Sequence, residues 1–261
     1  MPKKPRPARP RVIVTRRLTP SVEQRMVELF DTVLNPSDAP MSRDQLAAAM
    51  ADCDVLVPTV TDHIDAALIE AAPERLQMLA SFGNGVDHID LGAARKKGII
   101  VTNTPGVLTD DTADMTMALI IAVPRRLAEG EKLIRSGEWQ GWSPSGMLGH
   151  RIGGKRLGII GMGRIGQAVA LRAAPFGLSV AYHNRHRLPE SVERATHATW
   201  VESLDELIET SDFISIHCPL NDESRGMIDA RRLALLKPDA YLINTSRAEV
   251  YDEDALIEAL E

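Results

Sequence analysis

Short β-rich runs alternate with helical stretches along most of the chain, and this alternation limits the fold more than any other feature. After residue 11 the β-rich runs are RVIVT, DVLVPTV, LQMLAS and IIVTN, and DAALIEAA and VDHIDLGAARKKG are expected helices, the latter closed by Gly98. One face of a first helix is expected to carry Val22, Met26, Leu29, Phe30 and Val33. Repeated strand–helix units with short connections predict a parallel sheet covered by helices.

A long helical stretch, DDTADMTMALIIAVPRRLAEGEKLIRSGEW, breaks the alternation, and Pro124 is expected to interrupt it. The alternation restarts with RLGIIGMGRIGQAVALRAAPFG and continues through LSVAYHN, SLDELIET, DFISIHCPL, ARRLALL and AYLINTS. We therefore predict an α/β protein with two doubly wound parallel-sheet domains, residues 1–104 and residues 105–261, the second including the bridging helices.

Composition narrows the classes of partner. A net charge of -6 and an aromatic content of 4% argue against nucleic acid, which needs clustered basic residues. No apolar run approaches the roughly 20 residues that span a bilayer. Cys53 and Cys218 follow no metal or disulfide spacing, so we expect no metal site and reduced thiols in a cytoplasmic protein. The basic opening MPKKPRPARP is expected to be a solvated arm.

The glycines of GMGRIG follow a strand pattern directly and precede a helix pattern directly. Gly161, Gly163 and Gly166 form G-x-G-x-x-G, with Arg164 and Ile165 between the last two. The three glycines suit a tight turn, close approach of the backbone to a pyrophosphate, and close packing of helix on strand. This context predicts dinucleotide binding, with a chance glycine turn as the alternative.

The next strand ends in YHNRHR, and this tip bears on the choice of cofactor. A carboxylate that would hold the ribose hydroxyls of NAD is absent, and Asn184 stands there instead. Arg185 and Arg187 follow, and guanidinium groups attract a 2′-phosphate. We predict that NADP is preferred as NADPH and that NAD is possible. The alternative is a solvated basic turn beside a weakly bound NAD.

Several segments together resemble the D-isomer-specific 2-hydroxyacid dehydrogenase family, from about residue 50 to the end. They are SFGNGVDHIDLGAARKKGIIVTNTPG, TADMTMALIIAVPRR, GKRLGIIGMGRIGQAVA, HCPLNDESRGMID and LINTSRAEVYDEDAL. The tip HNRHR looks most like the glyoxylate and hydroxypyruvate reductase branch. The resemblance implies a flavodoxin-like substrate domain, a Rossmann domain, and reduction of a 2-oxo acid by hydride from a nicotinamide.

The same resemblance assigns roles to individual residues. Arg247 would be catalytic, binding the carboxylate and keto oxygen of the substrate, with a strand-end ion pair as the alternative. Asn84 and Gly85 would receive the carboxylate on backbone amides, unless they form a plain turn. Thr112 would contact the nicotinamide side, or cap a helix, and Leu108 would line the substrate pocket. Further cofactor contacts would come from Cys218, Pro219, Thr245 and Ser246, with core packing as the alternative for Cys218.

The family's proton donor is a histidine oriented by a glutamate, and both follow the stretch that matches residues 247–261. The resemblance therefore implies a C-terminally truncated chain of low activity, since general acid catalysis contributes about 10²–10⁴-fold. It also implies that the last strands of the cofactor domain and the return segment of the first domain are absent. Of the seven histidines, His217 is nearest to Arg247 by strand-end position, and we expect it to be structural.

Two further expectations concern assembly and rival functions. The resemblance suggests a homodimer built on the helices near residues 105–140, where MTMALIIAV is more apolar than one buried stripe needs; a single-chain core is the alternative. A dinucleotide sensor or corepressor on the same scaffold is the rival to an enzyme. Another Rossmann enzyme, such as an adenosylhomocysteine hydrolase type, is disfavoured by TNTPG and NTSRAEV.

Overall fold

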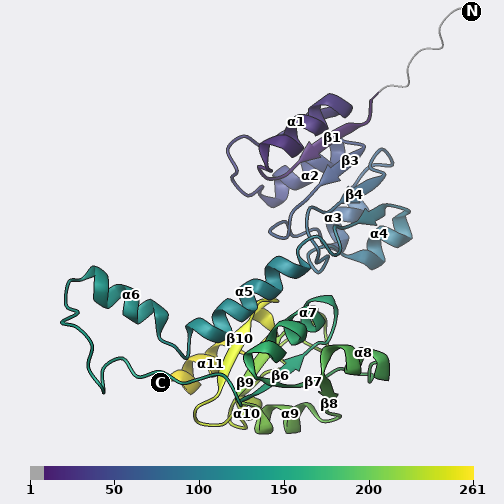
Figure 1. Ribbon diagram of the computed structural model, residues 1–261. Coiled ribbons are helices and arrows are strands. Elements are labelled where there is room, and N and C mark those ends of the chain that lie inside the picture. Colours follow the sequence, from purple (N-terminus) through teal and green to yellow (C-terminus); the bar gives the residue numbers. More distant parts are fainter. Residues whose placement is uncertain (1–8) are drawn as a thin grey trace, which may run out of the picture. The chain divides into compact units, whose positions relative to one another are not determined.

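The computed structural model describes residues 9–261 and contains two compact units, the first ending at Val107 and the second spanning Leu108–Glu261 (Figure 1). The expected solvated arm lies almost entirely outside the described residues. The domain limit after residue 104 stays a prediction. Within the described residues, no helix has both the length and the apolar character needed to cross a membrane.

The first unit contains a parallel sheet in the order β2-β1-β3-β4-β5. Its strands are β1 (Arg11–Val14), β2 (Asp31–Val33), β3 (Val55–Val57), β4 (Met78–Ala80) and β5 (Ile100–Thr102). Its helices are α1 (Pro20–Leu29), α2 (Arg43–Asp52), α3 (Ala66–Ala71) and α4 (Leu91–Lys97). This strand order is the flavodoxin-like one, with its switch point between β1 and β3.

Side chains of β1 alternate between two cores, which shows that helices cover both faces. Val12 and Val14 pack with Met26 of α1, whereas Ile13 packs with Met50 of α2 and its neighbours on α3 and α4. A strand places successive side chains on opposite faces, so a run of apolar residues fills both cores. The first unit is therefore doubly wound.

The structure corrects the expected first helix. Helix α1 ends at Leu29, Phe30 is its C-cap, and Val33 lies in β2. The prediction of one helical face that extends to Val33 was therefore wrong. Residues 31–33 pair with β1 instead, starting from a bond between the Asp31 N–H and the Pro10 carbonyl. Helix α4 begins at Leu91 rather than near residue 86, and it ends at Gly98 with φ of 76°, as predicted.

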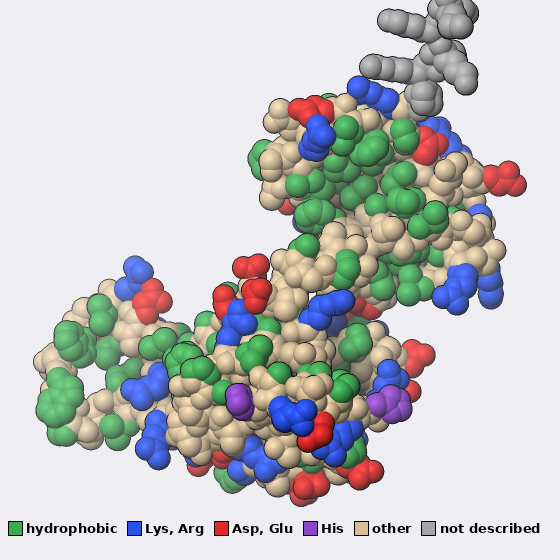
Figure 2. Space-filling view, turned by 45° about the vertical axis from the view of Figure 1, so that its right-hand side comes forward, with side chains coloured by type: hydrophobic (Ala, Val, Ile, Leu, Met, Phe, Trp, Pro, Cys, Tyr) green, Lys and Arg blue, Asp and Glu red, His purple; other side chains and the backbone are tan. Residues whose placement is uncertain are grey.

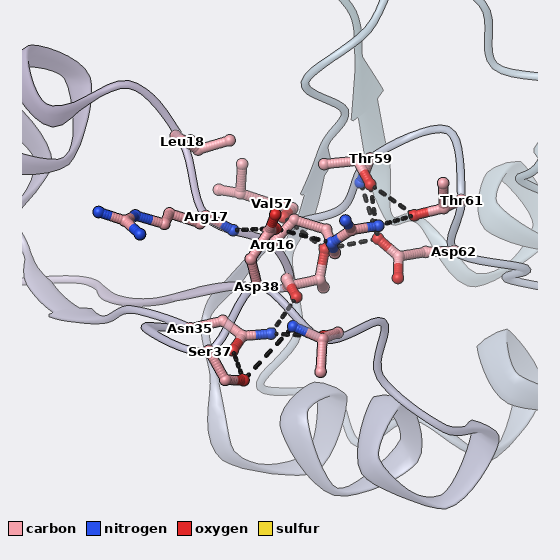
Figure 3. A network of polar contacts seen from close by, with 12 residues as sticks. Arg16, Arg17, Leu18, Asn35, Ser37, Asp38, Val57, Thr59, Thr61 and Asp62 are labelled. Carbon is pink, nitrogen blue, oxygen red and sulfur yellow. Dashed lines mark hydrogen bonds and ion pairs between the residues drawn. The ribbon is translucent and has the colours of Figure 1, made fainter.

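A polar network fixes the connections that follow β1 and β3 (Figure 3). The almost fully buried carboxylate of Asp62 accepts bonds from the Thr59 N–H, at 2.8 Å, and from the Thr15 hydroxyl. The Arg16 guanidinium donates to Asp38 and to Thr61, both at 3.0 Å. Polar groups that leave water need such partners, so the network holds two neighbouring loops in one conformation.

The second unit contains a parallel sheet in the order β10-β9-β6-β7-β8. Its strands are β6 (Arg156–Ile160), β7 (Ser179–His183), β8 (Ala198–Trp200), β9 (Phe213–Ile216) and β10 (Tyr241–Asn244). Its helices are α5 (Thr109–Ala122), α6 (Leu127–Arg135), α7 (Arg164–Ala173), α8 (Glu190–Thr196), α9 (Leu204–Thr210), α10 (Ala230–Leu233) and α11 (Glu253–Leu260), with 3-10 turns η1 (Ala174–Phe176) and η2 (Ala248–Val250). In chain order this is the 3-2-1-4-5 arrangement of dinucleotide-binding folds, with its switch point between β6 and β9.

Both faces of this second sheet are also covered. Leu157 and Ile159 of β6 pack against α5 and α7, whereas Ile160 and Ile214 pack against α9 and its neighbours. The prediction of two doubly wound parallel-sheet domains is therefore confirmed. The sequence did not predict α8 or β8, and β8 is only three residues long.

The long helical stretch is interrupted, as predicted, at Pro124, which lies between α5 and α6. Helix α6 buries no residue. The large hydrophobic side chains that α6 and the following loop expose are Leu127, Ile134, Trp139, Trp142, Met147 and Leu148. Figure 2 shows hydrophobic side chains at the surface of the segment that contains α6. The chain returns to the body of the unit at His150, whose N–H donates to the Pro124 carbonyl at 2.8 Å.

Candidate functional site

A cavity of about 740 Å³ opens in the second unit where β6, β7 and β9 end. Three connections form much of its wall, and they contribute Gly161–Gly163 after β6, His183–His186 at the end of β7, and His217–Pro219 after β9. Carboxyl ends of parallel strands beside a switch point are the usual place for ligands in such sheets. The sequence motif and the cavity therefore coincide.

Each glycine of the G-x-G-x-x-G turn meets a different steric demand. Gly161 has φ of 95°, and a Cβ there would lie 2.6 Å from the Cys218 nitrogen. A Cβ on Gly166 would collide with the Gly161 carbonyl oxygen and lie 3.2 Å from Ile159. A Cβ on Gly163 would meet nothing within 4 Å, which leaves free space beside the turn. The turn thus closes tightly on the protein side and stays open on the other, as close approach of a pyrophosphate requires.

Helix α7 presents its first backbone N–H groups without a side-chain cap, because its N-cap is Gly163. Arg164 and Ile165 are its first two residues. Unpaired N–H groups and the positive end of the helix dipole favour an anion at this point. The turn itself is fixed by bonds from the Gly161 N–H to the His183 carbonyl, at 3.0 Å, and from the Met162 N–H to the Asn184 amide oxygen, at 2.8 Å.

The two arginines of the β7 tip lie in different environments. Arg185 lines the cavity and pairs with Glu223 at 2.7 Å, with both side chains mostly exposed. Arg187 is not among the residues of the cavity wall. Its guanidinium makes two bonds to Glu193, at 2.9 and 2.7 Å, and lies 5.9 Å from the ring centre of Trp200. The Arg187 guanidinium also holds the pKa of Glu193 below its usual value.

Three residues after β9 face the cavity as uncharged groups. Burial lowers the pKa of His217 to about 4 and raises the pKa of the Cys218 thiol, so both are neutral near pH 7. The Nε2 atom of His217 lies 2.8 Å from the Ser215 hydroxyl. His217, Cys218 and Pro219 therefore offer an uncharged wall opposite the basic tip.

Thr245, Ser246 and Arg247 follow β10 at the same edge of the sheet but outside the cavity wall. The Asn244 amide donates to the Arg247 carbonyl at 2.8 Å and its oxygen accepts from the Ser246 N–H at 2.9 Å. The hydroxyls of Thr245 and Thr116 lie 3.0 Å apart, which ties this turn to α5.

The other predicted residues lie in separate places. Leu108 is the N-cap residue of α5, and Thr112 lies within that helix, so the alternative that Thr112 caps a helix was wrong. Asn84 and Gly85 lie in the loop after β4 of the first unit, where the Asn84 carbonyl accepts from the Asn103 amide at 2.7 Å. Their roles toward a substrate stay predictions.

Residues 117–261 match the model of the D-isomer specific 2-hydroxyacid dehydrogenase family, NAD binding domain. The chain belongs to this family. It is 46% identical over 259 residues to a glyoxylate reductase of Thermococcus litoralis, covering 97% of this chain and 76% of the relative. A glyoxylate reductase of Korarchaeum cryptofilum is 44% identical, covering 97% of this chain and 75% of the relative.

Solved structures of D-2-hydroxyacid dehydrogenases share the fold. A protein of Polaromonas sp. JS6 66, described as a D-isomer specific 2-hydroxyacid dehydrogenase, superposes with a TM-score of 0.87 at 40% identity. That comparison covers 97% of this chain and 79% of the other. The chain is thus an NAD(P)-dependent dehydrogenase by family, which favours the enzyme over the sensor or corepressor.

Several residues of this dehydrogenase's cavity wall were not predicted from the sequence. The wall residues not predicted include Met162, Gln167, His186, Leu188, Leu204, Asn221, Glu223, Ser224, Met227 and Arg232. Four of them fall in HCPLNDESRGM, which was noted only for its resemblance to the family. The position of that segment directly after a strand was the signal that could have placed them at the edge of the sheet.

His217 should make the second unit sensitive to acid. The unfolded imidazole binds a proton near pH 6.5, but the folded one does so only near pH 4, so protons favour the unfolded state between these values. The free energy of unfolding should be unaffected by this group above pH 6.5 and fall by about 3 kcal/mol as pH drops to 4. Urea unfolding curves across that range measure the loss.

His217→Gln should flatten this pH dependence, whereas His186→Gln, a change at an exposed ring, should leave it intact. Equal slopes for the His217→Gln variant and the parent chain would contradict the assignment.

Proposed function

We propose that this dehydrogenase reduces a small 2-oxo acid, glyoxylate or hydroxypyruvate, to the D-2-hydroxy acid, with NADPH preferred and NADH accepted. The observation that carries the proposal is the cavity that joins the open side of the Gly161–Gly163 turn to Arg185. The names of the similar glyoxylate reductases support the choice of substrate.

The cofactor would lie along the carboxyl edge of the second sheet and would supply the hydride. Its pyrophosphate fits the open side of Gly163 and the start of α7. The adenosine part would lie between the β7 tip, with Arg185 and Arg187, and the uncharged pair Cys218 and Pro219. The nicotinamide half would then run toward Thr245 and Ser246, which follow β10 on the far side of the switch point. Thr112 would join them, because α5 contacts this turn through the hydroxyls of Thr116 and Thr245.

In the second unit, Arg247 would bind the substrate and Leu108 would line its pocket. For Asn84 and Gly85 of the first unit, contact with the substrate is proposed separately, from the family resemblance alone. A guanidinium offers a planar fork of donors, so Arg247 can bind the carboxylate and draw charge onto the keto oxygen. Backbone amides of a glycine-containing loop can share the carboxylate. The Arg247 guanidinium would orient the keto carbon and stabilise the negative charge that develops on its oxygen.

We propose that turnover by this chain is slow. Reduction of a ketone needs a proton donor for the new alkoxide. In the second unit the rings of His150, His183 and His217 contact the Tyr241 hydroxyl, the Val201 carbonyl and the Ser215 hydroxyl, none of which is a carboxylate. A carboxylate partner is what raises a histidine pKa toward that of an acid useful at neutral pH.

Oxidation of NADPH and NADH, followed by absorbance with glyoxylate, hydroxypyruvate and pyruvate, tests the function. We expect slow oxidation with glyoxylate or hydroxypyruvate, and a lower dissociation constant for NADPH than for NADH because the basic tip attracts the 2′-phosphate. The preference for NADPH should fall when Arg185 and Arg187 are both changed to Gln. Tighter binding of NADH by the parent chain would contradict the cofactor choice, and fast turnover would contradict the proposal that proton transfer is slow.

We also propose a homodimer that covers the exposed hydrophobic side chains of α6 and its loop. Leu127 and Ile134 expose 55% and 64% of their surface, and Trp142 exposes 85%, which is unfavourable in water unless a partner covers them. The double variant Leu127→Glu, Ile134→Glu should shift the chain from dimer to monomer in light scattering. Leu91→Glu, at an exposed position in the first unit, should not. A monomeric parent chain would contradict the proposal.

A cytoplasmic location stays part of the proposal. Cys53 and Cys218 are free thiols, which suits a reducing compartment. Cell fractionation with an antibody to the chain tests it.

A further inference from the structure

We propose that Glu223 is a carboxylate that limits the preference for NADPH over NADH, acting from the wall of the cavity opposite the β7 tip. It would accept hydrogen bonds from the adenosine ribose hydroxyls of NADH and repel the 2′-phosphate of NADPH. This inference depends on one part of the proposed function, the binding of a nicotinamide dinucleotide in the cavity. Arg185 would pair with Glu223 when NADH is bound, and it would bind the 2′-phosphate when NADPH is bound.

The usual position for such a carboxylate is the end of the second strand, and here it cannot serve. Asn184 stands at the end of β7, and its amide oxygen already accepts the Met162 N–H. That oxygen therefore fixes the glycine turn and carries no net charge. A ribose on this side needs its acceptor from another part of the wall.

Glu223 lies in a turn whose backbone is fixed. The Asn221 side-chain oxygen accepts the N–H groups of Glu223 and Ser224, each at 3.0 Å. The Ser224 hydroxyl donates to the Pro219 carbonyl at 2.7 Å, which ties the turn to the segment after β9. The Glu223 side chain is 68% exposed and reaches Arg185 across the cavity at 2.7 Å.

The Arg185–Glu223 pair is suited to exchange. Ion pairs between exposed side chains contribute little net stability, so a ligand can replace either partner at low cost. Ribose hydroxyls can donate to Glu223 while the pair stays intact. A 2′-phosphate would take Arg185 and leave Glu223 facing a like charge, which weakens binding.

Arg187 lacks this freedom because its partner carboxylate is largely buried. The Glu193 side chain is only 10% exposed and also accepts the Tyr182 hydroxyl at 2.8 Å. Arg187 thus joins the loop after β7 to α8 with two hydrogen bonds. Of the two arginines, Arg185 is therefore the one expected to contact the phosphate, and Arg187 supports the tip.

Calorimetric dissociation constants for NADPH and NADH on the full chain test the inference. Glu223→Gln should strengthen NADPH binding and weaken NADH binding, so that the ratio of the two constants changes about tenfold or more. Asp222→Asn is the matched control, because it removes the same charge one residue away from a side chain that does not line the cavity. It should leave the ratio within about twofold.

The two proposals fail in different ways. If Glu223→Gln leaves the ratio unchanged while Arg185→Gln weakens NADPH binding, Glu223 has no role in selection and the proposed function stands. A ratio that changes equally in Asp222→Asn means a general charge effect and also overturns the inference. If the parent chain binds neither nucleotide, the proposed function itself fails, and this inference with it.

Discussion

Replacing Gly166 with valine is expected to destabilise the second unit by about 3 kcal/mol and abolish nucleotide binding, since forcing extra methyl groups into a packed site costs about 1–3 kcal/mol and sometimes more. Gly166 lies in the first turn of α7, against the carbonyl oxygen of Gly161 and the side chain of Ile159. The main-chain oxygen cannot move without opening the turn, and α7 cannot shift without leaving Leu157 and Ile159 uncovered. Urea unfolding and calorimetric titration with NADPH measure the two effects.

Gly163→Ala is the matched variant that separates folding from binding. A Cβ at this position meets no protein atom within 4 Å, so the free energy of unfolding should stay within about 0.5 kcal/mol of the parent. The same methyl group would occupy the space that the pyrophosphate needs, so nucleotide affinity should still fall. If Gly163→Ala binds NADPH normally, the phosphate does not approach that side of the turn.

The nucleotide-binding turn could be predicted because its requirements are local. Gly161, Gly163 and Gly166 must lie between a strand and a helix, and the apolar run before them and the amphipathic run after them are long enough to show both periods. The same reasoning failed at β2 and β8. Each has three residues at a sheet edge, too few for a period-2 pattern, and their place is decided by pairing with β1 and β7.

The sequence alone could not distinguish the roles of the two arginines that follow β7. Arg185 and Arg187 look equivalent in HNRHR, but α8 brings Glu193 to Arg187 and the segment after β9 brings Glu223 to Arg185. Both partners come from elements whose positions depend on the whole sheet. The predicted roles of Arg247 and Asn84 depended on family resemblance, because one sequence does not show which strand ends face a substrate.

Arg247→Gln is expected to lower the rate of NADPH oxidation with glyoxylate by about 10²–10³-fold, the usual effect of removing a donor to a developing oxyanion. Arg247 occupies the turn after β10, where the Asn244 side chain holds its carbonyl. Its own Nη1 donates to the Ser246 carbonyl at 3.0 Å, which limits the directions open to the guanidinium. Such a preorganised fork stabilises transition-state charge without first being ordered by the substrate.

Rates should be measured at enzyme concentrations above that of NADPH, so that a single turnover is visible even if the chain is slow. Arg247→Lys should recover part of the rate, because it keeps the charge but loses the fork. Arg194→Gln, at an exposed position on α8, controls for loss of one positive charge. The dissociation constant of NADPH separates the possible roles: if Arg247→Gln weakens NADPH binding as much as it slows oxidation, Arg247 holds the cofactor. An unchanged dissociation constant with a slow hydride step excludes a role in holding the cofactor. It supports the keto acid as the partner of Arg247, because the variant then loses stabilisation of the transition state and not NADPH binding.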